Sequence, residues 1–311
     1  MKTLVSQKHL SSHKFTLASI LAVLVVTSFV LSACATATAT PTSVATTAAT
    51  TAAPATEAAT VAATAAATKT PIHIKIGVSP VPHGDIINYI KENLAPAAGL
   101  DIEVVEFTDY VQPNLALADG TLDANYFQHV PYLNDFNKEH KTDLVPVVAV
   151  HIEPLGIYSK KIKSLTDITD GAVVAIPNDA TNAGRALNLL AANNLITLKD
   201  GVGYSATVND ITANPKKLKI TELEAAQLVR SLDDTTISVI NGNYALEGKL
   251  TPSKDALALE SAKDNPYANV LVVKKGHEND EGIQILAKLL TSPEVKKFIE
   301  DKYSGSVIPA F

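Results

Sequence analysis

Short apolar runs alternate with amphipathic segments between residues 71 and 311, and no other feature of the sequence limits the possible folds as strongly. Residues 72–78 alternate apolar and polar side chains with a period of two, which is typical of a strand, whereas residues 85–97 carry apolar side chains at helical spacing. Strands that alternate with helices predict βαβ units and a mostly parallel sheet. By the same criteria we expect strands at 101–107, 123–128, 144–150, 172–176, 218–220, 236–240 and 269–273, and helices at 112–118, 131–140, 182–193, 224–232, 278–290 and 293–303.

The alternation restarts after residue 150, so that two sets of α/β elements flank one long middle stretch. We therefore expect two lobes, lobe 1 from residues 71–152 with 247–311 and lobe 2 from residues 153–246. Ligands of open α/β sheets bind beyond the carboxyl ends of the strands. A cleft between the lobes would then be lined by strand-to-helix loops, and the hinge would lie near 150–156 and 246–268.

The N-terminus has the features of a secretory signal. Three lysines in the first 14 residues precede an uncharged apolar stretch at 15–30, which ends in Leu31-Ser32-Ala33-Cys34. A retained transmembrane anchor is the alternative, but 16 residues are fewer than the roughly 20 that a spanning helix needs. The four residues resemble the bacterial lipobox, in which the chain is cut before the Cys and the Cys is acylated. We expect residues 1–33 to be a signal peptide and Cys34 to carry lipid.

Residues 35–70 form a low-complexity segment in which 16 positions are Ala and 13 are Thr. No large apolar side chains are spaced so that they could bury a core, and two prolines interrupt any Ala helix. Together with the lipidated Cys34, residues 34–70 are therefore predicted to be a disordered tether, and the folded body is predicted to begin near Pro71.

The charge and sulfur content of the body exclude several classes of function. The formal net charge of the chain is −6. Residues 1–33 contain three lysines and no acidic residue, so the net charge of the remaining residues is more negative than −6. An acidic body argues against a nucleic-acid partner. Cys34 is the single cysteine, so disulfides, thiol catalysis and Cys-ligated metal are excluded from the body.

Aromatic side chains gather in residues 107–136. The segment 126–132 lies where a predicted strand runs into a helix, and its rings with a neutral His are suited to enclosing a flexible apolar group, including a thioether. Plain core packing is the alternative, although the polar tips of Tyr and His favour the wall of a cleft. The six aromatic residues are Phe107, Tyr110, Tyr126, Phe127, Tyr132 and Phe136.

The turn before the helix at 182–193 offers polar groups for the other half of a site. Arg185 follows Asn182 near the helix start and can bind a carboxylate, although a capped helix with a solvated Arg would have the same sequence. Only Arg185 and Arg230 are arginines, so Arg185 is less readily explained as a surface residue. Asn241 ends a predicted strand and could bond an ammonium or a carboxylate; the alternative is a turn-forming Asn beside Gly.

Motifs for catalysis are absent or weak, because the chain has no G-x-S-x-G, Walker loop or His-Glu-x-x-His. His83, His129 and His151 each lie near a strand end and could converge on a metal, which would make an extracytoplasmic metal-dependent hydrolase the remote alternative. We nevertheless expect no catalytic residue, no metal site and no cofactor.

Residues 72–311 resemble the methionine-binding lipoproteins of the NlpA family. The motifs that carry the resemblance are Asp109-Tyr110-Val111-Gln112-Pro113-Asn114, Phe127-Gln128-His129, Pro131-Tyr132-Leu133, Glu153-Pro154-Leu155-Gly156, Pro177-Asn178-Asp179, Gly184-Arg185-Ala186-Leu187, Val239-Ile240-Asn241 and Val307-Ile308-Pro309-Ala310-Phe311.

The resemblance implies a two-lobed periplasmic-binding-protein fold of type II with the ligand cleft between the lobes. It also implies a monomeric receptor, held by lipid at the extracytoplasmic face of the cell membrane, that delivers L-methionine to the permease and ATPase subunits of an ABC importer. A Met-containing dipeptide, D-methionine or another apolar amino acid is the alternative cargo.

The resemblance assigns roles by position. The methionine side chain would be enclosed by aromatic residues and a histidine, the carboxylate would be bound by an arginine, and the head group would contact two asparagines. Two departures, Val81 in place of a frequent Gly and Tyr126 in place of a small residue, could reshape the pocket. In that order, the assigned residues are Tyr110, Phe127, His129 and Tyr132, then Arg185, then Asn182 and Asn241.

Overall fold

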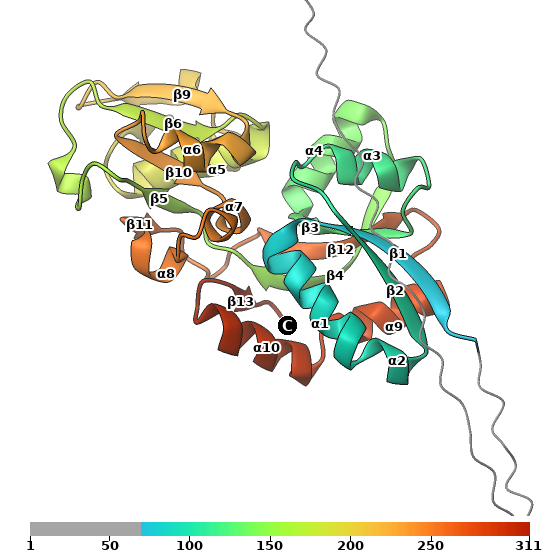
Figure 1. The fold of residues 1–311 in the computed structure, drawn as a ribbon. Coiled ribbons are helices and arrows are strands. Elements are labelled where there is room, and N and C mark those ends of the chain that lie inside the picture. Colours follow the sequence, from blue (N-terminus) through green and yellow to red (C-terminus); the bar gives the residue numbers. More distant parts are fainter. Residues whose placement is uncertain (1–69) are drawn as a thin grey trace, which may run out of the picture. The chain divides into compact units, whose positions relative to one another are not determined.

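The computed structural model describes residues 70–311, whose strands form a six-stranded, a five-stranded and a two-stranded sheet (Figure 1). The predicted signal peptide at 1–33, the lipidation of Cys34 and the predicted tether up to residue 69 lie outside the described residues. Among the helices of residues 70–311, none has the length and apolar character needed to cross a membrane.

The six-stranded sheet has the order β13-β4-β12-β3-β1-β2. Strand β1 is parallel to β2 and β3, whereas β12 runs antiparallel to both β3 and β4 and β13 runs antiparallel to β4. The period-two sequence of β1 places Ile74, Ile76 and Val78 in the core. The strands are β1 (Ile72–Val78), β2 (Leu100–Glu106), β3 (Ala124–His129), β4 (Leu144–Ile152), β12 (Ala268–Lys274) and β13 (Ile308–Pro309).

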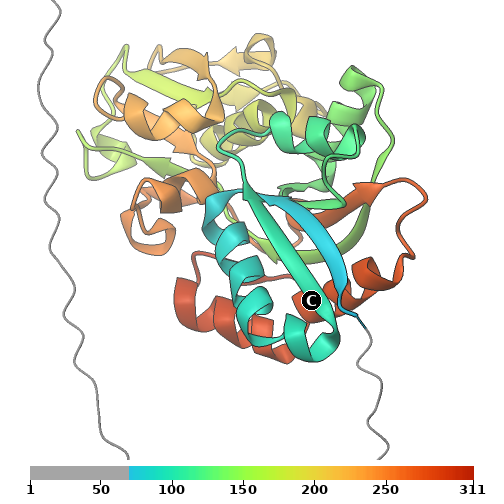
Figure 2. The same ribbon diagram turned by 45° about the vertical axis from the view of Figure 1, so that its right-hand side comes forward.

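Helices cover both faces of this sheet (Figure 2). Successive residues of β12 point to opposite faces, so Leu271 packs with one set of helices and Val270 with the other. The first set is α1 (Asp85–Asn93), α2 (Ala95–Ala98), α9 (Glu281–Leu290) and α10 (Pro293–Tyr303), and the second is α3 (Gln112–Ala118) and α4 (Val130–His140).

The five-stranded sheet has the order β11-β5-β10-β6-β9 and is also covered on both faces. Val174 and Val239 pack with helix α5 (Ala180–Ala192), whereas Ala175 and Ile240 pack with α6 (Leu228–Ser231) and α7 (Gly242–Glu247). The strands are β5 (Gly156–Tyr158), β6 (Val173–Pro177), β9 (Lys219–Leu223), β10 (Ile237–Ile240) and β11 (Ala258–Leu259).

Shorter elements complete the described chain. The two-stranded sheet pairs β7 with β8 in antiparallel fashion. These elements are β7 (Thr197–Leu198), β8 (Ile211–Ala213), α8 (Pro252–Asp255) and the helical turns η1 (Pro80–Gly84), η2 (Leu165–Asp167), η3 (Gly203–Ser205), η4 (Val208–Asp210) and η5 (Ala225–Gln227).

Two segments carry the chain between the larger sheets. The first crossover, residues 153–155, links β4 to β5, and the second crossover, residues 260–267, links β11 to β12. The segments lie side by side, because the Glu260 N–H donates to the Leu155 carbonyl at 2.8 Å. The last residue of the first crossover therefore contacts the first residue of the second crossover.

The predicted α/β fold is confirmed, but the expectation of a mostly parallel sheet is wrong. In the two larger sheets four strand pairings are parallel and five are antiparallel. The chain leaves the six-stranded sheet along β4 and returns along β12, so these neighbours run in opposite directions.

Some predicted helices are divided in the structure. The helix expected over 85–97 is interrupted at Leu94, whose φ is −121°, and α2 begins anew with Pro96 near its N-terminus, where the missing N–H has no cost. The helix expected over 224–232 is a 3₁₀ turn followed by the four residues of α6. Strands β5, β11 and β13 were not predicted, because two or three residues carry no periodic signal.

Candidate functional site

Three aromatic side chains from the six-stranded half of the molecule lie together, and we call Tyr110, Phe127 and Tyr132 the aromatic group. The ring centroids of Tyr110 and Tyr132 are 5.7 Å apart, those of Tyr110 and Phe127 are 5.9 Å apart, and those of Phe127 and Tyr132 are 6.2 Å apart. The Tyr132 hydroxyl donates to the backbone carbonyl of Tyr110 at 3.1 Å. The group combines apolar ring faces with polar tips.

His129 stands at the junction of β3 and α4 and faces the aromatic group. Its Nδ1 accepts the backbone N–H of Tyr132 at 3.2 Å and so caps the helix, which leaves the proton on Nε2. That Nε2 donates to the Oδ1 of Asn182 at 3.2 Å. Burial, and second the nearby Arg185, lowers the pKa of His129 to about 3, so the ring is neutral near pH 7.

Asn182 is the point at which three elements meet. Its Oδ1 also accepts from the Nδ2 of Asn241 at 3.0 Å, and its own Nδ2 donates to Asp179, the N-cap of α5, at 3.0 Å. The Oδ1 of Asn241 is buried and accepts no hydrogen bond from any described residue. A buried acceptor without a donor is costly, so this atom is suited to a donor on a ligand.

Arg185 follows on the next turn of α5 and is only 4% exposed. Its Nε donates to both carboxylate oxygens of Glu260, at 2.9 and 3.0 Å, and its Nη2 donates to Glu260 and to the backbone carbonyl of Glu153. The Tyr267 ring lies against the guanidinium with its centroid 4.2 Å from Cζ, and it meets the His129 ring at 4.8 Å. Arg185 is thus joined to both crossovers.

The structure brings all seven predicted site residues into one connected set. The aromatic group adjoins His129, which contacts Asn182, and Asn182 contacts Asn241; Tyr267 links His129 to Arg185. Sequence reasoning missed Tyr267 and Glu260, which lie in a segment without a recognisable motif. The predicted residues are Tyr110, Phe127, His129, Tyr132, Asn182, Arg185 and Asn241.

Helix α7 supplies further contacts that the sequence did not reveal. The Tyr110 hydroxyl donates to the Oδ1 of Asn243 at 2.6 Å, and the Tyr244 hydroxyl donates to the backbone carbonyl of Thr108 at 3.1 Å. The Tyr244 ring lies 5.0 Å from that of Tyr110. Asn243 and Tyr244 lie two and three positions after Asn241, so the same short segment contacts the aromatic group and Asn182.

Two cavities adjoin the site. One of about 450 Å³ is bordered by Tyr110, Tyr132 and Tyr244 and by five acidic residues, and the other, of about 760 Å³, is bordered by Arg185, Glu260 and residues of the second crossover. The first therefore reaches the aromatic end of the site and the second reaches the guanidinium. The acidic residues are Asp109, Asp135, Glu139, Asp179 and Glu224.

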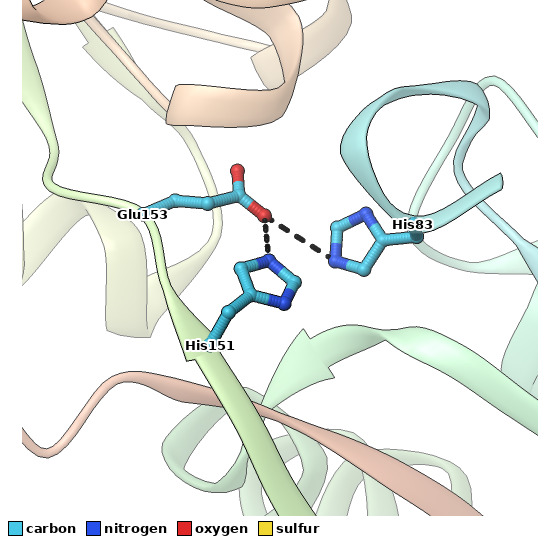
Figure 3. Close-up of side chains that lie close together, drawn as sticks. All are labelled: His83, His151 and Glu153. Carbon is cyan, nitrogen blue, oxygen red and sulfur yellow. Dashed lines mark hydrogen bonds and ion pairs between the residues drawn. The ribbon is translucent and has the colours of Figure 1, made fainter. Parts of the chain in front are cut away.

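A separate buried cluster contains two of the three histidines that the sequence offered for a metal. His83 and His151 converge on Glu153, and His129 is not among them (Figure 3). The Nε2 of His151 is 2.7 Å and the Nε2 of His83 is 3.3 Å from the Oε1 of Glu153. Ligand atoms around tetrahedral zinc lie about 3.3 Å apart when each bond is about 2.0–2.1 Å. The shorter contact has hydrogen-bond length, so the group is arranged as a hydrogen-bonded cluster.

The charges in this cluster are set by burial. Burial lowers the pKa of His83 to about 4 and that of His151 to about 3, and it raises the pKa of Glu153. Tyr126 belongs to this cluster, since its hydroxyl contacts the Nδ1 of His151. Tyr126 is fully buried in the core that packs on the six-stranded sheet, and Val81 also packs against that core.

Known proteins are similar to this chain over most of its described length. The family model described as NlpA lipoprotein matches residues 74–311. The D-methionine-binding lipoprotein MetQ of Escherichia coli strain K12 is 44% identical over 242 residues, which is 77% of this chain and 89% of the relative. The membrane lipoprotein TpN32 of Treponema pallidum is 41% identical over 238 residues, or 76% and 88% of the two chains.

Solved structures show the same architecture. A nutrient-binding protein from Burkholderia cenocepacia bound to methionine superimposes with a TM-score of 0.74 at 46% identity, covering 76% of this chain and 100% of that one. A crystal structure of the methionine-binding protein MetQ superimposes with a TM-score of 0.75 at 43% identity, covering 77% and 98%. The two sheets are thus those of periplasmic substrate-binding proteins of this type.

Proposed function

The chain belongs to the NlpA lipoprotein family, and on that premise we propose that it is a substrate-binding protein that captures methionine and delivers it to an ABC importer. The observation that carries the proposal is that the aromatic group, the asparagine pair and Arg185 form one connected site. A flexible apolar side chain and a charged head group can both be bound there.

The aromatic group would enclose the methionine side chain. Its rings meet at angles that leave edges as well as faces available, and a thioether packs favourably against ring edges. His129 contributes a neutral ring, because a buried cation would oppose the apolar contact and repel Arg185.

The asparagines and Arg185 would bind the amino-acid head group. Nη1 of Arg185 donates to no described residue, so it is free to bond a carboxylate. The unpartnered Oδ1 of Asn241 is a suitable acceptor for the ammonium. We propose that the ligand enters between lobe 1 and lobe 2, and that the lobes close by a hinge motion at the crossovers. We place the end of lobe 2 at the second crossover and not at residue 246, because β11 pairs with β5 in the five-stranded sheet.

The proposed cellular setting follows from the N-terminal sequence. Lipid on Cys34 would hold a monomeric receptor at the extracytoplasmic face of the cell membrane, where it would meet the permease and ATPase subunits of the importer. The proposal assigns the protein a binding role and no catalytic residue, cofactor or nucleic-acid partner.

Calorimetric titration tests the proposal. Protein is unfolded and refolded to release any bound ligand and is then titrated with L-methionine. We expect a saturable binding signal in the wild type, its loss in Arg185→Ala, and an unchanged signal in Arg230→Ala, which removes the other, exposed arginine. No signal in the wild type, or identical titrations of the wild type and Arg185→Ala, would contradict it.

Several relatives are named D-methionine-binding lipoproteins, so the handedness of the ligand needs its own measurement. Competition between L- and D-methionine, and mass spectrometry of ligand released from native protein, separate the enantiomers from each other and from a Met-containing dipeptide. Recovery of a dipeptide alone would replace free methionine as the cargo.

A further inference from the structure

The guanidinium of Arg185 is held by a partly buried carboxylate that none of the assigned head-group contacts explains. Glu260 contributes a side chain that is 16% exposed, and both of its carboxylate oxygens accept from Arg185. The pairing is bidentate, so it fixes the orientation of the guanidinium plane and not merely its position.

The protein occupies two of the three guanidinium nitrogens. Nε donates to Glu260, and Nη2 donates to Glu260 and to the carbonyl of Glu153. Among residues 70–311, nothing accepts from Nη1. The Tyr267 ring at 4.2 Å from Cζ restrains the plane from one side. Nη1 is therefore the guanidinium nitrogen that can donate to a ligand carboxylate, and its direction is fixed by the other contacts of Arg185.

Glu260 itself is held by the first crossover. The Leu155 N–H donates to its Oε2 at 3.3 Å, and the Glu260 N–H donates to the Leu155 carbonyl at 2.8 Å. Glu260 thus holds the guanidinium in a fixed position relative to both crossovers. This arrangement costs desolvation of two charges, and replacement of one partner would leave a buried charge unpaired.

We propose that Glu260 is a positioning residue that orients Arg185 and thereby makes the site select ligands with a free carboxylate. The inference rests on the proposed function, because it presumes that Arg185 binds the ligand carboxylate. Without Glu260, the long Arg side chain would regain rotamer freedom, and a carboxylate would have to reorder it on binding.

A simple electrostatic role predicts the opposite result. If Glu260 only competed with the ligand for Arg185, its neutralisation would leave the cation more available and methionine would bind more tightly. A merely structural role would weaken every ligand to the same extent. The three roles therefore differ in the sign and in the ligand dependence of the effect.

Binding of two ligands separates these roles. L-methionine and L-methioninamide, in which a neutral amide replaces the carboxylate, are titrated into the wild type, Glu260→Gln and Glu260→Asp. Glu294→Gln, which neutralises an exposed acid on α10, is the matched control. We expect Glu260→Gln to weaken methionine binding about 10- to 100-fold but to change methioninamide binding less than about 3-fold. Glu260→Asp should retain part of the methionine affinity that Glu260→Gln loses. Glu294→Gln should bind both ligands like the wild type. Tighter or unchanged methionine binding in Glu260→Gln, or equal losses for both ligands, would overturn the inference.

The two arginines of the chain allow a second measurement that needs no ligand. With ¹⁵N-labelled arginine, the spectrum of the Nε–H groups contains one signal from Arg185 and one from Arg230, and Arg230→Lys assigns them. We expect Arg185 to give a shifted, slowly exchanging signal that moves toward the position of free arginine in Glu260→Gln and stays in place in Glu294→Gln. An Arg185 signal that Glu260→Gln leaves unchanged would contradict the positioning role. Absence of methionine binding in the wild type would instead contradict the proposed function.

Discussion

The Nε2 of His129 lies 3.2 Å from the Oδ1 of Asn182, so the end of β3 in the six-stranded sheet is bonded to the helix that covers the five-stranded sheet. The same oxygen accepts from Asn241. One buried amide oxygen thus accepts two hydrogen bonds, of which the bond from His129 joins the two halves of the candidate site and the bond from Asn241 lies within the five-stranded half.

Replacement of this amide is expected to affect both neighbours. Asn182→Ala leaves the Nε2–H of His129 and the Nδ2 of Asn241 without an acceptor, and each buried unpaired group costs about 1–3 kcal/mol. We predict that methionine binding weakens about 10- to 100-fold in calorimetric titration. Asn134→Ala, at an exposed position of α4, is the control. Equal affinities for the two variants would show that this contact does not support the site.

The aromatic group allows the ring of Tyr132 to be separated from its hydroxyl. Tyr132→Phe loses the hydrogen bond to the Tyr110 carbonyl, which is worth about 1 kcal/mol of folding free energy, and keeps the ring. Tyr132→Ala loses the ring as well. We predict a small change in methionine affinity for Tyr132→Phe and a loss of at least about 10-fold for Tyr132→Ala. If both variants bound methionine like the wild type, Tyr132 would not enclose the ligand.

His129 is predicted to make stability depend on pH. Its pKa is lowered from the ordinary value of 6.5 to about 3 by burial, so between these values the unfolded chain binds a proton that the folded chain does not. The contribution to stability is fully present above pH 6.5 and is lost as pH falls, by at most about 1.4 kcal/mol per pH unit.

His129→Asn tests this titration while it retains a side chain that can cap α4. The free energy of unfolding is measured by urea denaturation at pH 7.5, 6.5, 5.5 and 4.5. We expect the wild type to lose more stability than the variant across the acidic part of this range. Parallel pH profiles would mean that His129 keeps an ordinary pKa in the folded protein.

Gly184 is required by a close approach between α5 and the chain near η3. A Cβ at this position would lie 2.1 Å from the backbone carbonyl oxygen of Tyr204. We predict that Gly184→Ala lowers the free energy of unfolding by about 1–3 kcal/mol, although Ala normally favours a helix. Gly84→Ala, where the nearest atom is 3.3 Å away and φ is −60°, should cost less. The denaturation midpoints of the two variants and the wild type are compared. A Gly184→Ala variant more stable than the wild type would show that the Cβ does not clash with the Tyr204 carbonyl.

The lipid anchor is tested by a single substitution. Cys34→Ser removes the predicted acylation site, so the protein should lose metabolic labelling with palmitate and move from the membrane fraction to the soluble fraction. A variant that remained membrane-bound without label would indicate a retained N-terminal anchor.

The site was predictable where residues are rare or occur in recognisable strand-to-helix junctions. Arg185 was predictable because the chain has only two arginines, and the segment 126–132 was predictable because aromatic residues surround a strand end. Glu260 and Tyr267 gave no such signal. Their role depends on the second crossover passing beside α5, which is a tertiary relationship without a local pattern.

The fold was predictable to a similar degree. Long periodic elements such as β1 and α10 were found, since their apolar spacing reflects the faces that they bury. The antiparallel direction of β12 in the six-stranded sheet was not predictable. It depends on the return of the chain from the second sheet, and no short window of sequence contains that information.

The position of β12 has a consequence for the order in which the protein can form. This strand lies between β4 and β3, so the two N-terminal strands on either side of it are not paired with each other. Residues 70–152 therefore cannot complete their sheet during synthesis until the ribosome has also produced residues 268–274. Bringing together segments so distant in sequence is slow, and in the interval the edges of β3 and β4 are open to other chains. The first sheet can therefore be completed only after the residues of the second sheet have been synthesised, and a chain truncated before β12 should aggregate rather than fold.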